Sequence, residues 1–321
     1  MNQDDMIRRL EKPCGKVDVV MDTDMYNEVD DIYALAYLLK SDDRLNLKAV
    51  FAAPFYSPPV LGRVRQTDSP AQGMEESYQA ILELLRVMNL ENLNPIVFHG
   101  SRSNLSDETK PVDSEAAREL IRLSRGYSAD HPLYVIAIAV ITDIASALLM
   151  DPTLKERIVV IWVGGHAWES NSCSDFNMIQ DIAAARVVFG CGVPLVQLPC
   201  NGVVSEFRVC KPELEYWLKG RNTLCDYLLR VTLEFVALQN PVGTWSKPLW
   251  DVTAVAWLLD KRFMQERLEH SPIPEYDRKY AFDHTRHFIK YVFQINRDIL
   301  LEDLFRKLTK GNENTTRETR D

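Results

Sequence analysis

Short apolar runs rich in Val and Ile recur along the first two thirds of the chain, with amphipathic segments between them. Runs of about four to eight such residues, bounded by turn signals, are typical of buried strands. The predicted strands are 17–21, 45–53, 95–99, 133–140, 157–163 and 194–198. The predicted helices are 30–40, 73–90, 114–125, 142–150 and 179–189. This alternation predicts an α/β fold with an open, mostly parallel sheet flanked by helices.

The alternation fades after Gly202, where the pattern predicts an elaborated helical C-terminal part with its strongest segments at 215–220, 222–239 and 251–263. Residues 57–73 contain three prolines and two glycines. That composition predicts a long surface loop, for which a lid or specificity element and a bland insertion are both open.

No linker divides the chain. We therefore predict one domain over residues 1–310, followed by a polar, flexible tail over residues 311–321.

The formal net charge of -9 disfavours a nucleic-acid partner, because nucleic-acid surfaces need clustered Lys and Arg. No stretch approaches the roughly 20 apolar residues of a membrane span, and the first residues lack the apolar core of a signal peptide. We therefore expect a cytoplasmic protein without a membrane partner. The six cysteines show no C-x-x-C spacing, which favours reduced thiols over zinc or disulfide frameworks.

Five acidic residues lie in the segment M-D-T-D-M-Y-N-E-V-D-D, residues 21–31, directly after the first predicted strand. Carboxylates this close raise one another's pKa unless a partner neutralises them. Hard cations such as Ca²⁺ and Mg²⁺ bind carboxylate, carbonyl and water oxygens. The motif alone leaves several readings open: a metal site at a strand end, a solvated helix start, an aspartyl phosphatase and a metal-dependent glycosyltransferase.

Further segments follow in an order that resembles the inosine-uridine-preferring nucleoside hydrolase family, the nucleoside N-ribohydrolases. The D-x-D and D-D pairs of residues 22–31 resemble the family's D-x-D-P-G-x-D-D. Residues 139–143 resemble its G-P-L-T-N, and residues 163–165 its M-G-G. Residues 175–185 resemble E-F-N-x-x-x-D-x-x-A-A, and residues 250–254 resemble H-D-x-x-A. The resemblance implies a Rossmann-like sheet and a divergent branch with an N-E-V-D-D form of the acidic motif.

The resemblance also implies a single Ca²⁺ held by Asp24, Asp31, the backbone carbonyl of Thr142 and Asp251, with water and the 2′- and 3′-hydroxyls of a ribose. Asp24 would act in addition as the general base that takes a proton from the metal-bound water. The implied activity is hydrolysis of the N-glycosidic bond of a ribonucleoside to free base and ribose. The implied partner is a small-molecule nucleoside, and family habit implies a homo-oligomer, either a dimer or a tetramer.

Three residues are expected to hold ribose hydroxyls: Asp30, Asp175 and Asn177. The alternative for Asp30 is helix-start electrostatics, and for Asp175 and Asn177 it is turn or N-cap chemistry. Asp22 is expected to orient the turn rather than to touch substrate.

The chain departs from the family pattern in several places, among them Asp175, which stands where the family prefers Glu. The acidic turn lacks Pro-Gly and is two residues longer, which is expected to aim Asn27 or Glu28 into the pocket. Residues 53–57, A-P-F-Y-S, stand where the family has a ribose-binding Asn, so Asn27 is a candidate replacement. Trp250 replaces the His that protonates the departing base, as in purine-preferring members, and stacking on a purine is expected; simple core packing is the alternative.

A second function is open beside hydrolysis. A ribose- or sugar-binding protein that keeps the fold and the metal site without turnover would also explain these departures.

Overall fold

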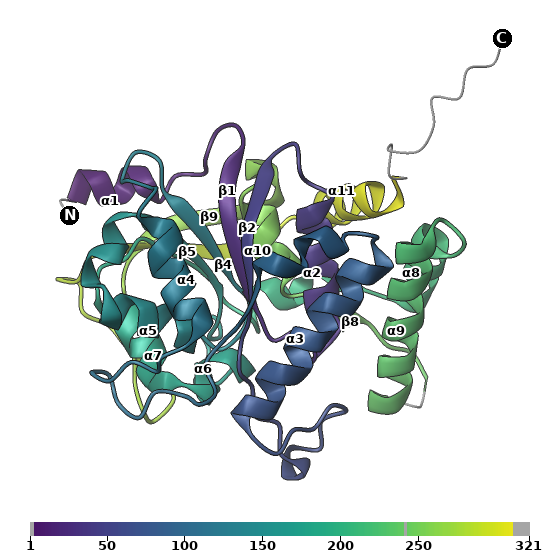
Figure 1. Ribbon diagram of the computed structural model, residues 1–321, viewed down its shortest axis with the longest axis horizontal. Helices are drawn as coiled ribbons and strands as arrows, with labels where there is room; N and C mark the ends of the chain where they lie inside the picture. The colour runs from purple at the N-terminus through teal and green to yellow at the C-terminus, as the bar shows by residue number, and fades with distance from the viewer. Residues whose placement is uncertain (1–2, 241–242, 311–321) are drawn as a thin grey trace.

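The computed structural model describes residues 3–240 and 243–310 (Figure 1). Its centre is an eight-stranded open sheet of order β3-β2-β1-β4-β5-β6-β12-β9. Neighbouring strands pair in parallel except β9, which runs antiparallel to β12. The strands of this sheet are β1 (Val17–Thr23), β2 (Leu45–Ala52), β3 (Val97–His99), β4 (Leu133–Ala137), β5 (Ile158–Val163), β6 (Leu195–Leu198), β9 (Met264–His270) and β12 (Phe288–Ile295). The predicted α/β class with a mostly parallel sheet is thus confirmed.

Helices cover both faces of the sheet. They are α1 (Gln3–Arg9), α2 (Asp30–Leu39), α3 (Pro70–Val87), α4 (Glu115–Ser124), α5 (Thr142–Met150), α6 (Phe176–Gln180), α7 (Ile182–Gly190), α8 (Lys211–Leu218), α9 (Thr223–Gln239), α10 (Val252–Trp257) and α11 (Arg297–Thr309). Figure 1 shows α4, α5 and α7 on one side of the sheet and α2, α3, α8 and α9 on the other.

Short elements complete the chain. The 3₁₀ turns are η1 (Pro59–Leu61), η2 (Glu91–Ile96), η3 (Pro152–Glu156), η4 (Val204–Glu206) and η5 (Lys261–Phe263). Two small antiparallel pairs join β7 (Arg208–Val209) to β8 (Lys247–Pro248), and β10 (Ile273–Pro274) to β11 (Tyr280–Ala281).

Alternate side chains of β1 enter two separate hydrophobic cores. Val19 and Met21 pack in the core that includes α2 and α10, whereas Val20 packs in the core that includes α4 and α5. Because both faces of the strand are buried, its sequence is a nearly continuous apolar run without polar alternation. The acidic residues at the carboxyl end of β1 therefore lie between the two cores.

The structure corrects three details of the sequence prediction. The helix predicted at 179–189 is broken into α6 and α7, because the Asp181 side chain accepts a hydrogen bond from the Ala184 amide and starts a new helix. The predicted loop 57–73 ends at Ser69, which caps α3 at Pro70. The C-terminal part contains the predicted helices, but β9 and β12 also lie in it and extend the main sheet.

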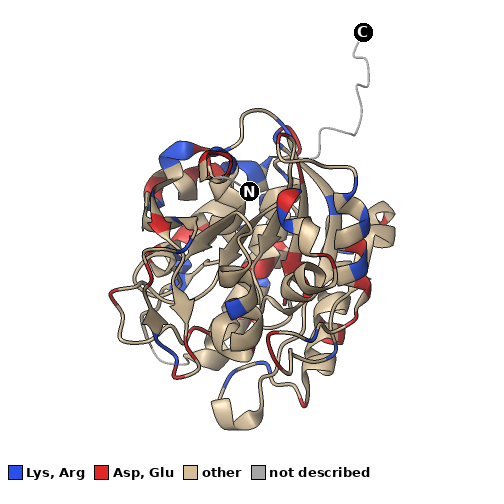
Figure 2. Cartoon of the chain, turned by 90° about the vertical axis from the view of Figure 1, so that its left-hand side faces the viewer, with Lys and Arg blue, Asp and Glu red and all other residues tan. Residues whose placement is uncertain are grey.

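The predicted tail 311–321 lies outside the described residues. Within the described ranges, no helix is both long and apolar enough to cross a membrane. Acidic and basic positions are interspersed over the side of the molecule that Figure 2 shows.

Candidate active site

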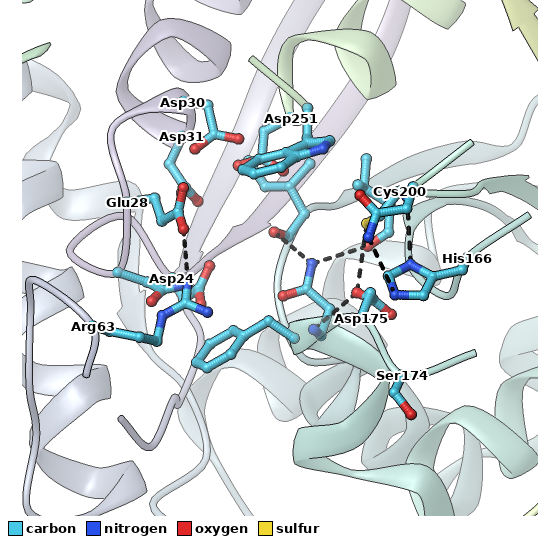
Figure 3. Close-up of a pocket in the computed structure, with 17 residues that line it drawn as sticks. Asp24, Glu28, Asp30, Asp31, Arg63, His166, Ser174, Asp175, Cys200 and Asp251 are labelled. Atoms are coloured by element: carbon cyan, nitrogen blue, oxygen red, sulfur yellow. Dashed lines mark hydrogen bonds and ion pairs between the residues drawn. The ribbon is translucent and has the colours of Figure 1, made fainter. Parts of the chain in front are cut away.

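A cavity of about 240 Å³ opens at the carboxyl ends of the central strands (Figure 3). The chain leaves β1 toward β2 on one side and β4 toward β5 on the other, so β1 and β4 flank the point where the strand order reverses. Open α/β sheets bind ligands at such points. The lining residues are Asp24, Asn27, Glu28, Asp30, Asp31, Arg63, Ile138, Val163, His166, Ser174, Asp175, Phe176, Asn177, Cys200, Asn201, Trp250 and Asp251.

Three carboxylates meet in this cavity. Asp30 and Asp31 begin α2, and Asp251 directly precedes α10, which packs against α2. One oxygen of each carboxylate lies within 4.8 Å of the others, and all three side chains are buried. The hydroxyl of Thr23 at the end of β1 donates to Oδ1 of Asp31 at 2.5 Å. The fold therefore concentrates negative charge from distant parts of the sequence.

Burial dominates the protonation of these acids. Burial, and then the charge of Asp30, raises the pKa of Asp31 to about 7. Burial and the charges of Asp30 and Asp31 raise the pKa of Asp251 well above its usual range. Burial and Asp31 likewise raise the pKa of Asp24, which the nearby Arg63 partly lowers. Without a cation, the site favours protonated carboxyls.

The raised pKa of Asp31 predicts that the stability of the folded protein changes with pH. A carboxyl whose pKa is raised by folding stabilises the fold below its unfolded pKa, near 4, and that contribution is lost as pH rises through the folded value. For Asp31 the folded value is about 7. In chelator, we expect the thermal unfolding midpoint to fall between about pH 4 and pH 7, and to fall less in Asp31→Asn. Equal slopes for the two proteins would contradict the burial of an acidic Asp31.

Several buried polar atoms of the site lack a hydrogen-bond partner among the described residues. The oxygen atoms among them are Oδ2 of Asp24, Oδ2 of Asp30 and Oδ1 of Asn27. Leaving such atoms without a partner costs about 1–3 kcal/mol each, and more when they are charged. A hard divalent cation together with a hydroxyl-rich ligand would satisfy them, and this all-oxygen donor set suits Ca²⁺. The residues present therefore fit the cation that the sequence resemblance implies.

The residues predicted from the sequence lie in the cavity with one exception. The lining set includes Asp24, Asn27, Asp30, Asp31, Asp175, Asn177, Trp250 and Asp251. Thr142, the first residue of α5, is buried outside this lining set, and its hydroxyl donates to Oδ2 of Asp181 at 2.7 Å. The metal role predicted for its backbone carbonyl stays a prediction.

The hydrogen bonds of Asp175 are those of a helix N-cap, the role given above as the alternative to a ribose contact. Its Oδ1 accepts from the amides of Gly165, at 2.5 Å, and Met178, at 3.1 Å, and its Oδ2 accepts from the Asn177 amide at 2.9 Å. Asp175 thus caps α6 and ties it to the end of β5. A ribose contact from this carboxylate stays a prediction.

Two hydrogen bonds from the side-chain amide nitrogen of Asn177 orient this residue. Its Nδ2 donates to the carbonyls of Ile138, at 3.2 Å, and Val163, at 2.9 Å. These bonds connect the ends of β4 and β5, and they leave Oδ1 as the side-chain acceptor for a ligand. The predicted contact with a sugar hydroxyl is therefore stereochemically reasonable.

The two-residue extension of the acidic turn has two distinct environments. Asn27 is 7% exposed and lines the cavity. Glu28 pairs with Arg63 at 2.7 Å and with Lys247, so it connects the acidic turn to loop 57–69 and to β8. Sequence reasoning did not identify Arg63 or Lys247. Two arginines, Arg63 and Arg65, close together in a Pro-rich loop were the available signal, but nothing in the sequence marks Glu28 as their partner.

The chain is similar to known proteins in sequence and in fold. The family model described as inosine-uridine preferring nucleoside hydrolase matches residues 61–298, more than half of the chain. The chain is 25% identical over 156 residues to a pyrimidine-specific ribonucleoside hydrolase of Enterobacter. The aligned region covers 47% of this chain and 49% of that protein. The chain thus spans about half the length of this curated relative.

Solved structures show the same fold. A plant nucleoside hydrolase has a TM-score of 0.72 and 18% identity, covering 92% of this chain and 99% of that one. A purine-preferring ribonucleoside hydrolase from Gardnerella vaginalis has a TM-score of 0.70 and 17% identity, covering 91% and 98%. The type III effector protein XopQ, solved in complex with adenosine diphosphate ribose, has a TM-score of 0.65 and 16% identity, covering 97% and 99%. From the family match, the chain belongs to the inosine-uridine preferring nucleoside hydrolase family.

Proposed function

We propose that this protein hydrolyses the N-glycosidic bond of a ribonucleoside to free base and ribose in a Ca²⁺-dependent reaction. The observation that carries the proposal is the buried cluster of Asp30, Asp31 and Asp251. This cluster shares one cavity with Oδ2 of Asp24, which has no hydrogen-bond partner among the described residues. Such a cluster, at the ligand-binding edge of a sheet in a nucleoside hydrolase family member, suits a ribose and a cation.

Asp24, Asp31, Asp251 and the backbone carbonyl of Thr142 are the residues proposed to hold Ca²⁺. When bound, the cation would neutralise the carboxylates, lower the pKa of a coordinated water and bind the 2′- and 3′-hydroxyls of the sugar. The cluster of close oxygens includes Asp30. We nevertheless assign Asp30 to the sugar, because the Lys247 ammonium lies 4.0 Å from its Oδ1 and balances part of its negative charge.

Asp24 is proposed as the general base. It accepts a proton from water while the water oxygen forms a bond to the anomeric carbon, and the electron pair of the breaking carbon–nitrogen bond moves to the base. The sugar passes through an oxocarbenium-like state with developing positive charge. The buried carboxylates around it stabilise that charge because they are fixed in place before the reaction.

Asn27 is proposed to replace the missing asparagine after β2. Its buried Oδ1 has no partner among the described residues and accepts a hydrogen bond from a ribose hydroxyl. Asn27→Ala is expected to raise KM about tenfold with little change in kcat, because the bond forms equally with substrate and transition state. The control is Asn46→Ala, which removes an amide bound to Asp18 at the opposite end of β1. A fall in kcat at unchanged KM would contradict this role.

Trp250 is proposed to stack on the base. One face of its indole is covered by the Lys247 ammonium, 4.3 Å from the ring centroid, while the residue also lines the cavity. Its Nε1–H lacks a partner among the described residues. A large aromatic surface favours the larger, purine base. This preference is our proposal, since the similar proteins include both pyrimidine-specific and purine-preferring hydrolases.

A ribose- or sugar-binding function without turnover is the alternative. The similarity of fold to an effector protein solved with adenosine diphosphate ribose favours it. A chromatographic panel of purine and pyrimidine nucleosides, with Ca²⁺ or with chelator, separates the two functions. Free base from at least one nucleoside in Ca²⁺ supports hydrolysis. Tight ribose binding without release of base from any nucleoside supports the alternative.

A further inference from the structure

The cavity has a floor of buried oxygen-bearing groups and a rim of planar groups. The floor consists of side chains that are 8% exposed or less: Asp24, Asn27, Asp30, Asp31, Asp175, Asn177 and Asp251. The rim consists of partly buried residues, among them the Arg63 guanidinium, the Phe176 ring and the Trp250 indole. A ribose suits the floor, because its hydroxyls meet acceptors there. The attached planar base then extends to the rim.

Arg63 is held at this rim by two contacts. Its Nη2 donates to Oε1 of Glu28 at 2.7 Å, and its Cζ lies 4.0 Å from the centroid of the Phe176 ring. Figure 3 shows Arg63 below Glu28 and beside Asp24, across the cavity from Asp175 and His166. The guanidinium therefore lines the cavity at its rim, against the Phe176 ring.

Two donors of the Arg63 guanidinium remain available. No hydrogen bond joins its Nε or Nη1 to any part of the chain that the structure describes, and the side chain is 26% exposed. Glu28 does not fully neutralise the positive charge of Arg63, since the same carboxylate also binds the buried Lys247. One carboxylate thus faces two cations. A second carboxylate, that of Asp30, lies 4.0 Å from the Lys247 ammonium.

The loop that carries Arg63 is fastened to the acidic turn. Nη1 of Arg65 donates to the backbone carbonyls of Tyr26, at 2.6 Å, and Glu28, at 2.8 Å. Its guanidinium also lies 4.8 Å from the Tyr26 ring centroid. The longer turn therefore supplies both the Glu28 carboxylate for Arg63 and carbonyl acceptors for Arg65. This arrangement fixes the guanidinium of Arg63 in advance of substrate binding.

Cleavage of an N-glycosidic bond needs a way to accept negative charge on the departing base. The electron pair of the bond moves to the base nitrogen, and the base departs easily only if that charge is neutralised. Trp250, at the place of the family's histidine, has no proton that it can give up at neutral pH. A guanidinium keeps its proton as well, but it stabilises an adjacent negative charge through planar, charge-assisted hydrogen bonds.

We propose that Arg63, positioned by Glu28, binds the departing base and stabilises the negative charge that develops on it as the bond breaks. The inference rests on the proposed function. The base leaves with the electron pair, Asp24 receives the proton of the attacking water, and solvent protonates the free base afterwards. Arg63 is a catalytic residue in this account and Glu28 a positioning residue.

The test compares two leaving groups on the same sugar. One substrate is the nucleoside that the wild type hydrolyses fastest, and the other is 4-nitrophenyl β-ribofuranoside, whose phenolate leaves without assistance. Arg63→Gln is expected to lower kcat for the nucleoside about a hundredfold, the size of the loss when one preorganised donor is removed from a transition state. The same variant is expected to hydrolyse the nitrophenyl riboside within about threefold of the wild-type rate.

Three further variants define the outcome. Glu28→Gln should show the same substrate-dependent loss in smaller measure, and Arg63→Lys should recover part of the nucleoside rate. Arg118→Gln removes an arginine paired with Asp113 on the surface, 68% exposed, and should change neither rate. Equal losses on both substrates in folded Arg63→Gln, or no loss on either, would overturn the role of Arg63 while leaving the proposed hydrolysis intact. A wild type that cleaves neither substrate would overturn both.

Discussion

Asp24→Asn is expected to lower kcat for nucleoside hydrolysis by about a thousandfold, within the range seen for loss of a general base. The side chain is 2% exposed in the floor of the cavity, and its Oδ2 has no partner among the described residues. The amide keeps the shape of the carboxylate but cannot accept the proton of the attacking water. The measurement is steady-state release of free base, followed by chromatography at saturating substrate and Ca²⁺.

Asp18→Asn is the matched control, because it makes the same chemical change in the strand that Asp24 directly follows. Asp18 lies at the opposite end of β1, where it accepts hydrogen bonds from Asn46 and Tyr127. It should lower stability modestly and leave kcat unchanged. If Asp24→Asn retained more than about a tenth of the wild-type kcat, the assignment of the base would be wrong.

Removal of Ca²⁺ is expected to abolish hydrolysis and to lower the thermal unfolding midpoint. A ligand that binds only the folded state stabilises it by about 2.7 kcal/mol at a hundredfold excess over its Kd. The rise should be larger at higher pH, because the raised pKa values of the buried carboxyls make protons compete with the cation. Asp251→Asn should lose both the Ca²⁺-dependent rise of the midpoint and the activity. Differential scanning calorimetry with Ca²⁺ and with chelator measures the first effect.

Asp260→Asn provides the control for that experiment. Asp260 follows α10 at its far end, where it pairs with Arg262 away from the cavity. The control should keep the full rise of the midpoint with Ca²⁺. A rise of equal size in Asp251→Asn would place the cation elsewhere, and the role of Asp251 in metal binding would have to be abandoned.

The central strands were predictable from the sequence because both of their faces are buried, which makes them apolar without interruption. β9 was not, because its sequence, M-Q-E-R-L-E-H, belongs to an edge strand and is mostly polar and charged. The apolar run of β12 is clear in retrospect. It followed several helical segments, so the chain gave no sign that it returns to the main sheet beside β6.

The parts of the acidic site that lie within short sequence motifs were predictable. Asp24 and Asp31 belong to one motif, and Asp251 to a second motif that the resemblance connects to it. The environment of Glu28 was not predictable, since its partners Arg63 and Lys247 come from a loop and from β8, which are far apart in the sequence. Only the fold brings these charges together. The expected homo-oligomer stays a prediction, because the structure concerns one chain.

The most direct test of the central claim follows both products in one reaction. With the best nucleoside substrate, wild-type protein in Ca²⁺ should release free base and reducing sugar in equal amounts. Both signals should stop when chelator is added and resume when Ca²⁺ is restored in excess. Binding of the nucleoside without either product, or release of base that continues at the same rate in chelator, would contradict Ca²⁺-dependent N-glycosidic hydrolysis at this site.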